Sequence, residues 1–327
     1  MGRPAAMIEF SPPPAEGLPL VCHPADGSDM SHPALDLLAA ERPRLEDRLL
    51  VHGALLLRGF GLGSVADFQR LVALFCDGDP LDYAGGASPR SRVAGASGVY
   101  TSTDYPPAMA LSLHNELSYA ESWPKRLFFY CVTAPASGGE TTLGDSRRIL
   151  AAIDPRVLEP LRARGIRYVR NLSPHKGSGY SWQDAFETDD PQAAEQGCRR
   201  IGTDYTWRPG GFLRLNQVRP ATAVHPVTGE EVWFNQADGF HPSALDPDTY
   251  REQLALCGSE ADFRLNVGYG DGAPIEPAAL DHIRSVLRAH TIPHRWREGD
   301  VLILDNLLAA HGRAPFAGPR KIVVAMG

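Results

Sequence analysis

The first third of the chain carries hydrophobic patterns that predict helices on either side of one buried strand. Apolar residues recur at helical spacing over residues 33–52, and Gly53 follows as a stop. The unbroken run ALLLRGF at 54–60 predicts a buried strand. Ser64 then opens the segment SVADFQRLVALF, in which Asp67 supplies a carboxylate to the first turn, so a capped helix is predicted there.

Two stretches in this region lack such a pattern. Residues 1–30 are rich in Pro and Gly and are expected to form an irregular leader. Residues 85–98 are rich in Gly and Ser, contain Arg90 and Arg92, and show no apolar period. A loop of this length in a compact domain is typically a lid or disordered.

Farther along the chain, strands alternate with helices. RLFFYCVTA (126–134) predicts a strongly apolar strand, and GGETTLGDS (138–146) predicts a turn into a short strand, with Asp145 capping the next helix. Residues 155–290 mix helical stretches with short strands, of which IRYVRNL (166–172) is the clearest. The middle of the chain is therefore expected to be mixed α and β.

The C-terminal part is predicted to be one helix followed by strands. PAALDHIRSVLRAH (277–290) begins with proline at a favoured helical position. HRWREGD (294–300), VLILDN (301–306) and, after a turn, RKIVVAM (320–326) are all interpreted as β-structure.

The order of these elements predicts the fold class. Strands lie near both ends of the chain with helical material between them, and neither an internal repeat nor a linker is visible. We therefore expect one domain over residues 1–327, mainly β with α, in which about 155–290 form a large insertion between the strands of a barrel.

Composition excludes several classes of protein. The chain has 327 residues, 43% hydrophobic and 22% charged, and its formal net charge of −7 offers no basic field to gather nucleic acid or an anionic membrane. The five cysteines are dispersed without a CxxC pair, which indicates free thiols in a reducing compartment. Neither a signal peptide nor an apolar run of membrane-spanning length is seen, so a cytoplasmic protein is expected.

Three side chains form a candidate metal site. His114 and Glu116 are two residues apart in LSLHNELSY, and on a strand such residues point to the same face. With 11 His and 39 Asp plus Glu, roughly one such pair is expected by chance, so the pair alone indicates little. His311 directly follows the apolar stretch VLILDNLLAA, and two histidines with one carboxylate are the ligand set that leaves three positions open on iron(II).

Arg320 adds a possible anion site nine residues after His311, just before the final strand. A buried arginine there would hold a carboxylate by two parallel charge-assisted hydrogen bonds. The alternative is a solvated charge in a Gly-Pro turn. The adjacent Lys321 is the rival cation, although on a strand it points to the opposite face.

These motifs resemble one known family. LHNELSYAESWPKRLFFYCVTAPASGGETTLGDSR and ILDNLLAAHGRAPFAGPRKIVVAMG are similar to the core segments of the taurine dioxygenase (TauD/TfdA) family, and HPVTGEEVWFNQADGFHPSAL is similar to its middle segment. The branch that they resemble includes the SyrP-like amino-acid hydroxylases of syringomycin biosynthesis. The similarity covers most of the chain from about residue 50 onward.

The resemblance implies a distorted double-stranded β-helix (jelly-roll, cupin-like) with flanking helices, iron(II), and 2-oxoglutarate and O2 as cosubstrates. It implies that His114, Glu116 and His311 bind the metal. Arg320 then matches the arginine on the distal carboxylate of 2-oxoglutarate, and Thr141 matches the threonine whose hydroxyl assists there.

The chain departs from the taurine enzyme at two positions. Glu116 stands where that enzyme has aspartate; halogenating relatives have a small residue there, so a carboxylate favours hydroxylation. Val324 stands where the taurine enzyme has a second arginine for the sulfonate, which makes taurine a poor candidate substrate.

Four further residues are candidates for substrate contact, each with a structural alternative. Ser102 and Thr103 precede the metal motif and would line the pocket, or else form turns and caps. Arg219 and Asn235 would bind a carboxylate or a carrier phosphate; the alternatives are a surface ion pair and a structural hydrogen bond.

Other residues are assigned structural roles. Trp233 and Phe234 are interpreted as core aromatics, and Asn306 as a support for the metal ligands or a turn residue. His225 and His241 lie beside prolines without a paired acid and are not included in the site.

The predicted activity is hydroxylation of an amino acid or related carboxylic acid in secondary metabolism such as antibiotic biosynthesis, with release of succinate and CO2. The substrate is free or bound to a peptidyl carrier protein. One alternative keeps the cofactors but produces desaturation, cyclisation or an isonitrile. The other is a catalytically silent barrel that binds a metal or ligand.

Overall fold

The fold is described from a computed structural model. It describes residues 8–11, 17–25, 34–76, 78, 80, 81, 83, 85–88, 90–102, 104–177 and 180–327.

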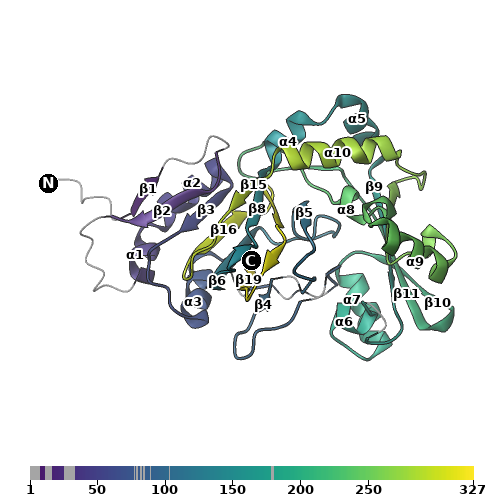
Figure 1. Ribbon diagram of the computed structural model, residues 1–327, viewed down its shortest axis with the longest axis horizontal. Coiled ribbons are helices and arrows are strands. Elements are labelled where there is room, and N and C mark those ends of the chain that lie inside the picture. The colour runs from purple at the N-terminus through teal and green to yellow at the C-terminus, as the bar shows by residue number, and fades with distance from the viewer. Residues whose placement is uncertain are drawn as a thin grey trace.

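A seven-stranded sheet forms the largest layer (Figure 1). All neighbouring strands in it are antiparallel except β2 and β3, which are parallel. In spatial order its strands are β1 (Ile8–Ser11), β2 (Leu20–Pro24), β3 (Ala54–Leu57), β16 (Val301–Asp305), β6 (Arg126–Thr133), β19 (Lys321–Met326) and β4 (Val99–Thr101).

A second, four-stranded antiparallel sheet packs against the first and carries most of the site. Its strands in spatial order are β15 (Ile292–His294), β8 (Thr141–Asp145), β17 (Ala309–Arg313) and β5 (Leu111–His114). Two short strands, β7 (Ser137–Gly138) and β18 (Phe316–Ala317), pair beside it.

Both faces of the large sheet are buried, which explains its continuous apolar strands. In β16, Leu302 and Leu304 pack with Leu143 of the second sheet, whereas Val301 and Ile303 pack with the helices on the outer face. Alternating side chains point to opposite faces, so a strand buried on both sides needs an apolar residue at every position.

Helices cover the outer faces of both sheets (Figure 1). The outer face of the large sheet is covered by α2 and α3, with α1 against α3, and the second sheet is flanked by α4, α5 and α10. These helices are α1 (Ala34–Ala40), α2 (Arg42–His52), α3 (Val65–Phe75), α4 (Ser146–Ala152), α5 (Pro155–Arg164) and α10 (Pro277–Ala289).

The middle of the chain forms a third region beside the second sheet, on the right of Figure 1. It is built on a four-stranded sheet ordered β10-β11-β9-β14, accompanied by the hairpin of β12 and β13 and by short helices. The strands are β9 (Ile166–Leu172), β10 (Asp204–Arg208), β11 (Phe212–Arg219), β12 (Thr222–Val224), β13 (Glu231–Trp233) and β14 (Leu265–Tyr269). The helices are α6 (Trp182–Phe186), α7 (Pro191–Arg200), α8 (Ala237–Phe240) and α9 (Pro247–Cys257), with 3₁₀ turns at Pro209–Gly211, Pro242–Ala244 and Glu260–Asp262.

Several sequence predictions of helix ends are confirmed by their contacts. The Ser64 side chain accepts a hydrogen bond from the backbone N–H of Asp67, and the Asp145 carboxylate caps α4 in the same way. Gly53 ends α2 at φ 71°, and a Cβ there would lie 3.1 Å from Leu308, so glycine satisfies both the left-handed turn and the close approach.

Three predictions about local structure are wrong. The expected irregular leader contains β1 and β2, because these segments pair with each other and with β3. Residues 295–300 are a turn region and not a strand. The apolar stretch read as one strand before His311 is two strands, β16 and β17, separated by a turn at 306–308.

Two further findings concern the cysteines and the length of the helices. All five cysteines are free, and three of them are buried. In the described part of the chain no helix is both long and apolar enough to cross a membrane.

His294 on β15 predicts how acid affects stability. The imidazole is buried, and burial lowers its pKa from 6.5 to about 4. Between these pH values His294 is protonated in the unfolded chain but not in the folded protein. The free energy of unfolding therefore falls as the pH is lowered through this window. Above pH 6.5 His294 has no such effect. The loss of folding stability is about 3 kcal/mol, because each unit of pKa difference corresponds to about 1.36 kcal/mol.

Replacing His294 with glutamine should remove this pH-dependent contribution to stability. Chemical denaturation at a series of pH values should show a flatter curve for His294→Gln than for the wild type. The variant His175→Gln, which changes an exposed histidine, serves as the control. An unchanged slope in His294→Gln would contradict the assignment of this titration.

Candidate metal centre and its cavities

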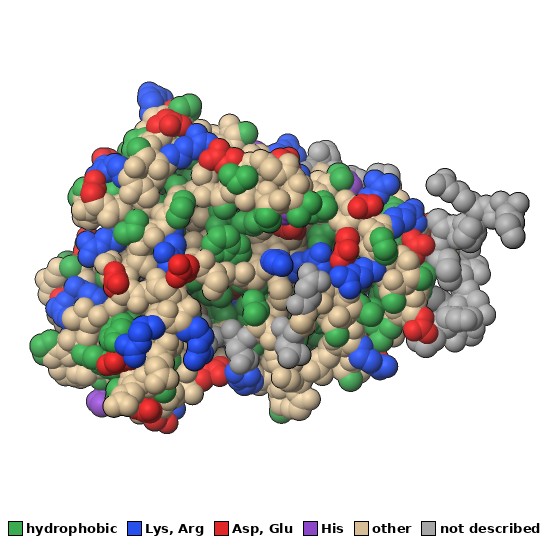
Figure 2. Space-filling model, turned by 180° about the vertical axis from the view of Figure 1, so that it is seen from behind, with side chains coloured by type: hydrophobic (Ala, Val, Ile, Leu, Met, Phe, Trp, Pro, Cys, Tyr) green, Lys and Arg blue, Asp and Glu red, His purple; other side chains and the backbone are tan. Residues whose placement is uncertain are grey.

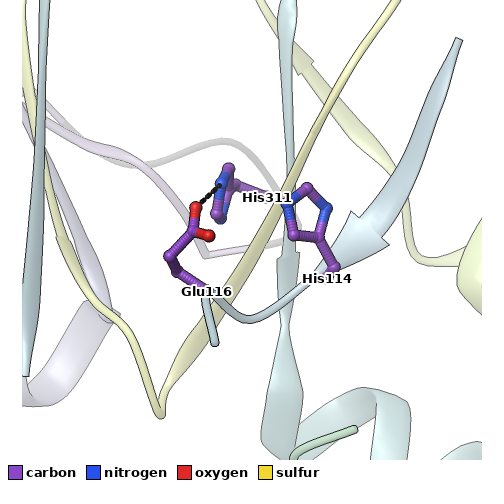
Figure 3. A group of neighbouring side chains, drawn as sticks. All are labelled: His114, Glu116 and His311. Carbon is purple, nitrogen blue, oxygen red and sulfur yellow. Dashed lines mark ion pairs between the residues drawn. The ribbon is translucent and has the colours of Figure 1, made fainter. Parts of the chain in front are cut away.

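Three side chains, from two adjacent strands and the turn that follows one of them, converge on one point (Figure 3). His114 ends β5, His311 lies in the middle of β17, and the two residues are paired across these strands. Ligand atoms of His114, Glu116 and His311 all lie within 4.8 Å of one another, and His311 Nε2 is 3.9 Å from Glu116 Oε2. These three are the residues expected from the sequence.

Glu116 reaches this point differently from the sequence prediction. It was expected on a strand with His114, but β5 ends at His114 and Glu116 lies in the turn that follows. The chain then passes through Leu117 at φ 55°, a left-handed conformation. The turn, and not strand alternation, brings the carboxylate back toward the histidines.

The strand that carries His311 is shaped by the glycine beside it. The pairing of β17 with β5 shifts register between His311 and Arg313. A Cβ on Gly312 would lie 2.5 Å from the Leu111 carbonyl oxygen and 2.6 Å from Thr142 Oγ1, so only glycine permits this approach. The close approach keeps His311 beside His114.

Both imidazoles are held in states that suit metal binding. His114 Nδ1 lies 2.9 Å from the Ser112 carbonyl oxygen, so Nδ1 carries the proton and Nε2 keeps its lone pair. Burial, followed by the proximity of His114 and of the Arg90 guanidinium, holds the pKa of His311 well below its ordinary value. A neutral imidazole is the form that binds a metal.

Asn306 supports the carboxylate ligand, as one of its two sequence interpretations predicts. Its Oδ1 accepts the Glu116 N–H at 2.8 Å, and its Nδ2 donates to the carbonyl oxygens of Glu116 and Pro124 at 3.0 and 2.9 Å. The side chain is fully buried. It therefore joins the Glu116 turn to the turn between β16 and β17.

Replacing Asn306 with alanine should weaken metal binding without removing a ligand. Loss of partners that orient metal ligands typically costs 10- to 100-fold in metal affinity. We expect a drop of about that size for Asn306→Ala, measured by competition with a fluorescent chelator. Asn266→Ala, which removes a different asparagine hydrogen bond in the β14 region, should leave the affinity unchanged; equal losses in both would point to general destabilisation.

A small cavity opens beside His114 and His311 and contains the residues expected to bind 2-oxoglutarate. Arg320 Nε donates to the Gly139 carbonyl oxygen and Nη1 donates to Ser102 Oγ, both at 3.0 Å. Among the described residues no carboxylate pairs with Arg320, and burial lowers the pKa of its guanidinium to about 10. A largely buried cation without a counter-ion favours an anionic ligand.

Thr141 lines the same cavity, and a hydrogen bond from Trp296 orients its hydroxyl group. Trp296 Nε1 donates to Thr141 Oγ1 at 3.0 Å, so the hydroxyl hydrogen of this buried threonine remains available for another acceptor. Arg313 also lines the cavity, and its guanidinium donates to the backbone carbonyls of Tyr105, Pro106 and Met109.

Residues 321 and 324 agree with the sequence argument. Lys321 is exposed, whereas the neighbouring Arg320 faces the cavity. Val324 is fully buried among the apolar residues between the two sheets, so no basic group occupies that position.

The four candidate substrate residues have different outcomes. Ser102 lines the small cavity, and Thr103 lies outside the described residues. Asn235 and Arg219 line neither of the two cavities at the metal ligands, which corrects their proposed role. Asn235 bonds to the backbone of Ala221 and Ala237, and Arg219 to that of Val218 and Gly202, so both are structural.

Two of the other assignments are tested by contacts. Trp233 and Phe234 are buried in apolar clusters, as expected. His225 was expected to lack a paired acid, but its Nε2 lies 3.0 Å from Asp305 Oδ2. Asp305 also accepts two backbone N–H groups of the turn at 306–308, so this pair organises the turn before β17.

A larger cavity meets the metal ligands from the other side and contains charged residues that the sequence argument missed. His114, Glu116 and Arg90 line it together with Asp238 and Arg264. The face turned away from the viewer in Figure 1 is hollowed near its centre, with hydrophobic side chains in the hollow and basic ones near its edge (Figure 2). Asp238 and Arg264 come from the middle of the chain, and no local motif marks them.

The donor set fits iron(II). Two imidazoles and one carboxylate converge, and open space adjoins them on two sides, as an ion with free coordination positions requires. Arg90 donates to Glu116 Oε2 and is almost fully buried, so it holds the carboxylate in place.

Comparisons with known proteins agree with this geometry. The model of the taurine catabolism dioxygenase TauD, TfdA family matches residues 18–326. The chain is 36% identical to the dapdiamide synthesis protein DdaC of Enterobacter agglomerans, over 90% of this chain and 88% of that protein. It is 30% identical to a clavaminate synthase-like protein of Arabidopsis thaliana, over 94% and 93% of the two chains.

A solved structure supports the fold. PvcB, described as an Fe, alpha-ketoglutarate dependent oxygenase from an isonitrile synthetic pathway, matches with a TM-score of 0.54 at 18% identity, over 100% of this chain and 93% of that one. The chain therefore belongs to the TauD/TfdA family and is an iron(II)- and 2-oxoglutarate-dependent oxygenase.

Proposed function

We propose that this oxygenase hydroxylates an unactivated C–H bond of an amino acid or related carboxylic acid in secondary metabolism. The observation that carries the proposal is a pair of cavities that share His114, of which the smaller also reaches His311 and the larger also reaches Glu116. The smaller cavity contains the largely buried cation of Arg320, and the larger one contains charges of both signs.

In this proposal each residue of the site has a defined task. His114, Glu116 and His311 hold the iron, Arg320 binds the distal carboxylate of 2-oxoglutarate, and the Thr141 hydroxyl donates to the same carboxylate. Iron(II), 2-oxoglutarate and O2 supply the oxidising power, with release of succinate and CO2. The protein contributes position and exclusion of water: apolar side chains of the two sheets enclose the site on the core side.

The architecture and setting of the enzyme are part of the proposal. The two facing sheets correspond to the double-stranded β-helix of the family, and residues 155–290 are an insertion within one domain. The SyrP-like branch remains a prediction. We propose a cytoplasmic enzyme whose partner is a small amino-acid-like molecule, either free or bound to a peptidyl carrier protein.

A different outcome at the same site is the second candidate. The tyrosine isonitrile desaturase of Pseudomonas aeruginosa is 28% identical over 83% of this chain. Because this relative is named as a desaturase, desaturation is the alternative outcome. Hydroxylation and desaturation both begin with removal of a hydrogen atom from the substrate. The carboxylate at Glu116 supports hydroxylation over halogenation but does not separate hydroxylation from desaturation.

One experiment distinguishes these functions. Purified protein with iron(II), 2-oxoglutarate and O2 is incubated with a panel of free and carrier-loaded amino acids, and succinate and product mass are measured. Gain of one oxygen supports hydroxylation, and loss of two hydrogens supports desaturation. Absence of both O2 uptake and succinate release with every compound would leave the silent metal-binding protein as the better description.

A further inference from the structure

The larger cavity contains a buried carboxylate without an ionic partner. Asp238, in the first turn of α8, is 4% exposed and lines the cavity. Its Oδ2 accepts a hydrogen bond from Ser112 Oγ at 2.9 Å, and no ion pair to its carboxylate is found among the described residues. The nearby Arg284 donates to the Asp238 backbone carbonyl, to Ser243 and to Asp281 instead.

The environment of Asp238 favours a cationic ligand. Burial raises the pKa of its carboxyl group, which means that ionisation costs free energy in the absence of a partner. An ammonium group placed against this carboxylate would stabilise the ionised form. The Ser112 hydroxyl, the charge of Arg284 and the Gly239 backbone N–H favour the ionised form, but burial outweighs them.

The same cavity contains a cation whose donors are only partly used. Arg90 has a side chain that is 3% exposed, and it lies against the ring of Tyr83 with 4.7 Å from Cζ to the ring centroid. Nη2 donates to Glu116, whereas Nε and Nη1 have no hydrogen-bond partner among the described residues. Unsatisfied buried donors of a guanidinium are costly and match a carboxylate ligand.

These two charges flank the metal ligands. Ser112, which holds Asp238, is two residues before His114 on β5, and Arg90 is paired with Glu116. A ligand that bridged the two charges would lie across the metal-ligating residues. Arg264 is a weaker candidate for the anion, because it already donates to the Ala87 carbonyl and the Tyr105 hydroxyl.

We propose that the larger cavity binds a free amino acid as its zwitterion, with the ammonium group on Asp238 and the carboxylate on the N–H donors of Arg90 that Glu116 leaves free. This assignment rests on the proposed function, because only an oxygenase acting on amino acids places its substrate at this point. It excludes a carrier-bound aminoacyl thioester, which has an ammonium group but no carboxylate for Arg90.

The test measures binding in an unreactive complex. The protein is loaded with manganese(II) and N-oxalylglycine, and the common L-amino acids, ornithine, β-alanine and γ-aminobutyrate are titrated by calorimetry. Each amino acid that binds is then compared with its N-acetyl form and its methyl ester. We expect either modification to raise Kd by at least about thirtyfold, because it leaves one buried charge unpaired.

Two variants link each half of the ligand to its residue. Asp238→Asn should no longer discriminate against the N-acetyl form, and Arg90→Gln should no longer discriminate against the ester. The matched controls Asp248→Asn and Arg92→Gln change exposed charges of the insertion and of the Arg90 loop, and should behave as wild type. Comparison of ligands on the wild type keeps the test valid if a variant fails to fold.

The outcomes separate this inference from the proposed function. Equal binding of acid and ester, or of amino acid and N-acetyl form, overturns the zwitterion assignment, as does binding of none of the panel while N-oxalylglycine still binds. Succinate release by the iron(II) enzyme is measured in parallel. If it persists, the oxygenase function stands although the inference fails; if it is absent, the proposed function fails.

Discussion

The variant Glu116→Ala is expected to lose product formation to background and to bind iron(II) more than about a hundredfold more weakly. Loss of groups that merely orient ligands already costs 10- to 100-fold in metal affinity, so loss of a ligand should cost more. The variant also leaves Arg90 next to the metal position without the carboxylate that neutralises it. Metal affinity is measured by chelator competition, and activity by product mass.

A small carboxylate should partly restore this variant. Formate fits the space left by the glutamate side chain and would be held by Arg90, so added formate should raise both metal affinity and activity. Glu121→Ala, which removes an exposed glutamate five residues farther along, is the control and should match the wild type. Full activity of Glu116→Ala without formate would show that another acid is the ligand.

The variant Arg320→Ala should raise the KM for 2-oxoglutarate by roughly a hundredfold or more. Removing one partner of a buried, hydrogen-bonded charge pair typically costs about 2–5 kcal/mol in binding. Iron affinity should be unchanged, because Arg320 contacts Gly139 and Ser102 and is not among the metal-ligating residues. Succinate release as a function of 2-oxoglutarate concentration measures the effect.

Two companion variants define the role of the guanidinium. Arg320→Lys should recover only part of the affinity, because an ammonium group cannot form two parallel hydrogen bonds to a carboxylate. Lys321→Ala should leave the KM unchanged, since this neighbouring lysine is exposed. A KM that responds to Lys321 and not to Arg320 would contradict the cavity assignment, and a KM that responds to neither would remove the 2-oxoglutarate site from this cavity.

The three candidate metal ligands could be predicted from the sequence, two of them from a local motif and the third from the family resemblance. His114 and Glu116 are separated by one residue, and His311 lies in the C-terminal segment that resembles the family. The sequence did not show that Glu116 lies in a turn, because the bend depends on Asn306 from a distant part of the chain. The three side chains therefore converge as the sequence predicts, although Glu116 reaches this point from a turn and not from a strand.

The turn between β16 and β17 was not predicted, because it is itself largely apolar. The turn at 306–308 contains two buried leucines, so only Asp305 and Asn306 interrupt the apolar run between β16 and β17. Its shape is fixed by Asp305, which accepts the N–H groups of Leu307 and Leu308 and pairs with His225. That pair joins residues 80 positions apart in the sequence, a separation at which hydrophobic periodicity carries no signal.

The charged residues of the larger cavity could not be predicted for the same reason. Asp238 lies in a short helix of the middle region, and Arg90 lies in a Gly/Ser-rich stretch that predicts only a loop. Their burial depends on packing between distant segments. Arg90, for example, is placed by a loop whose Gly85 carbonyl accepts from Arg170 of β9.

Arg90 lines both cavities and is paired with Glu116, so one guanidinium adjoins both proposed ligand sites and one candidate metal ligand. Such sharing makes the binding events thermodynamically interdependent. If a ligand in one cavity changes the affinity of the other cavity by some factor, the second ligand changes the affinity of the first by the same factor, because coupling free energies are reciprocal. Substitutions at position 90 are therefore expected to alter the cooperativity between cosubstrate and substrate as well as the affinity for each.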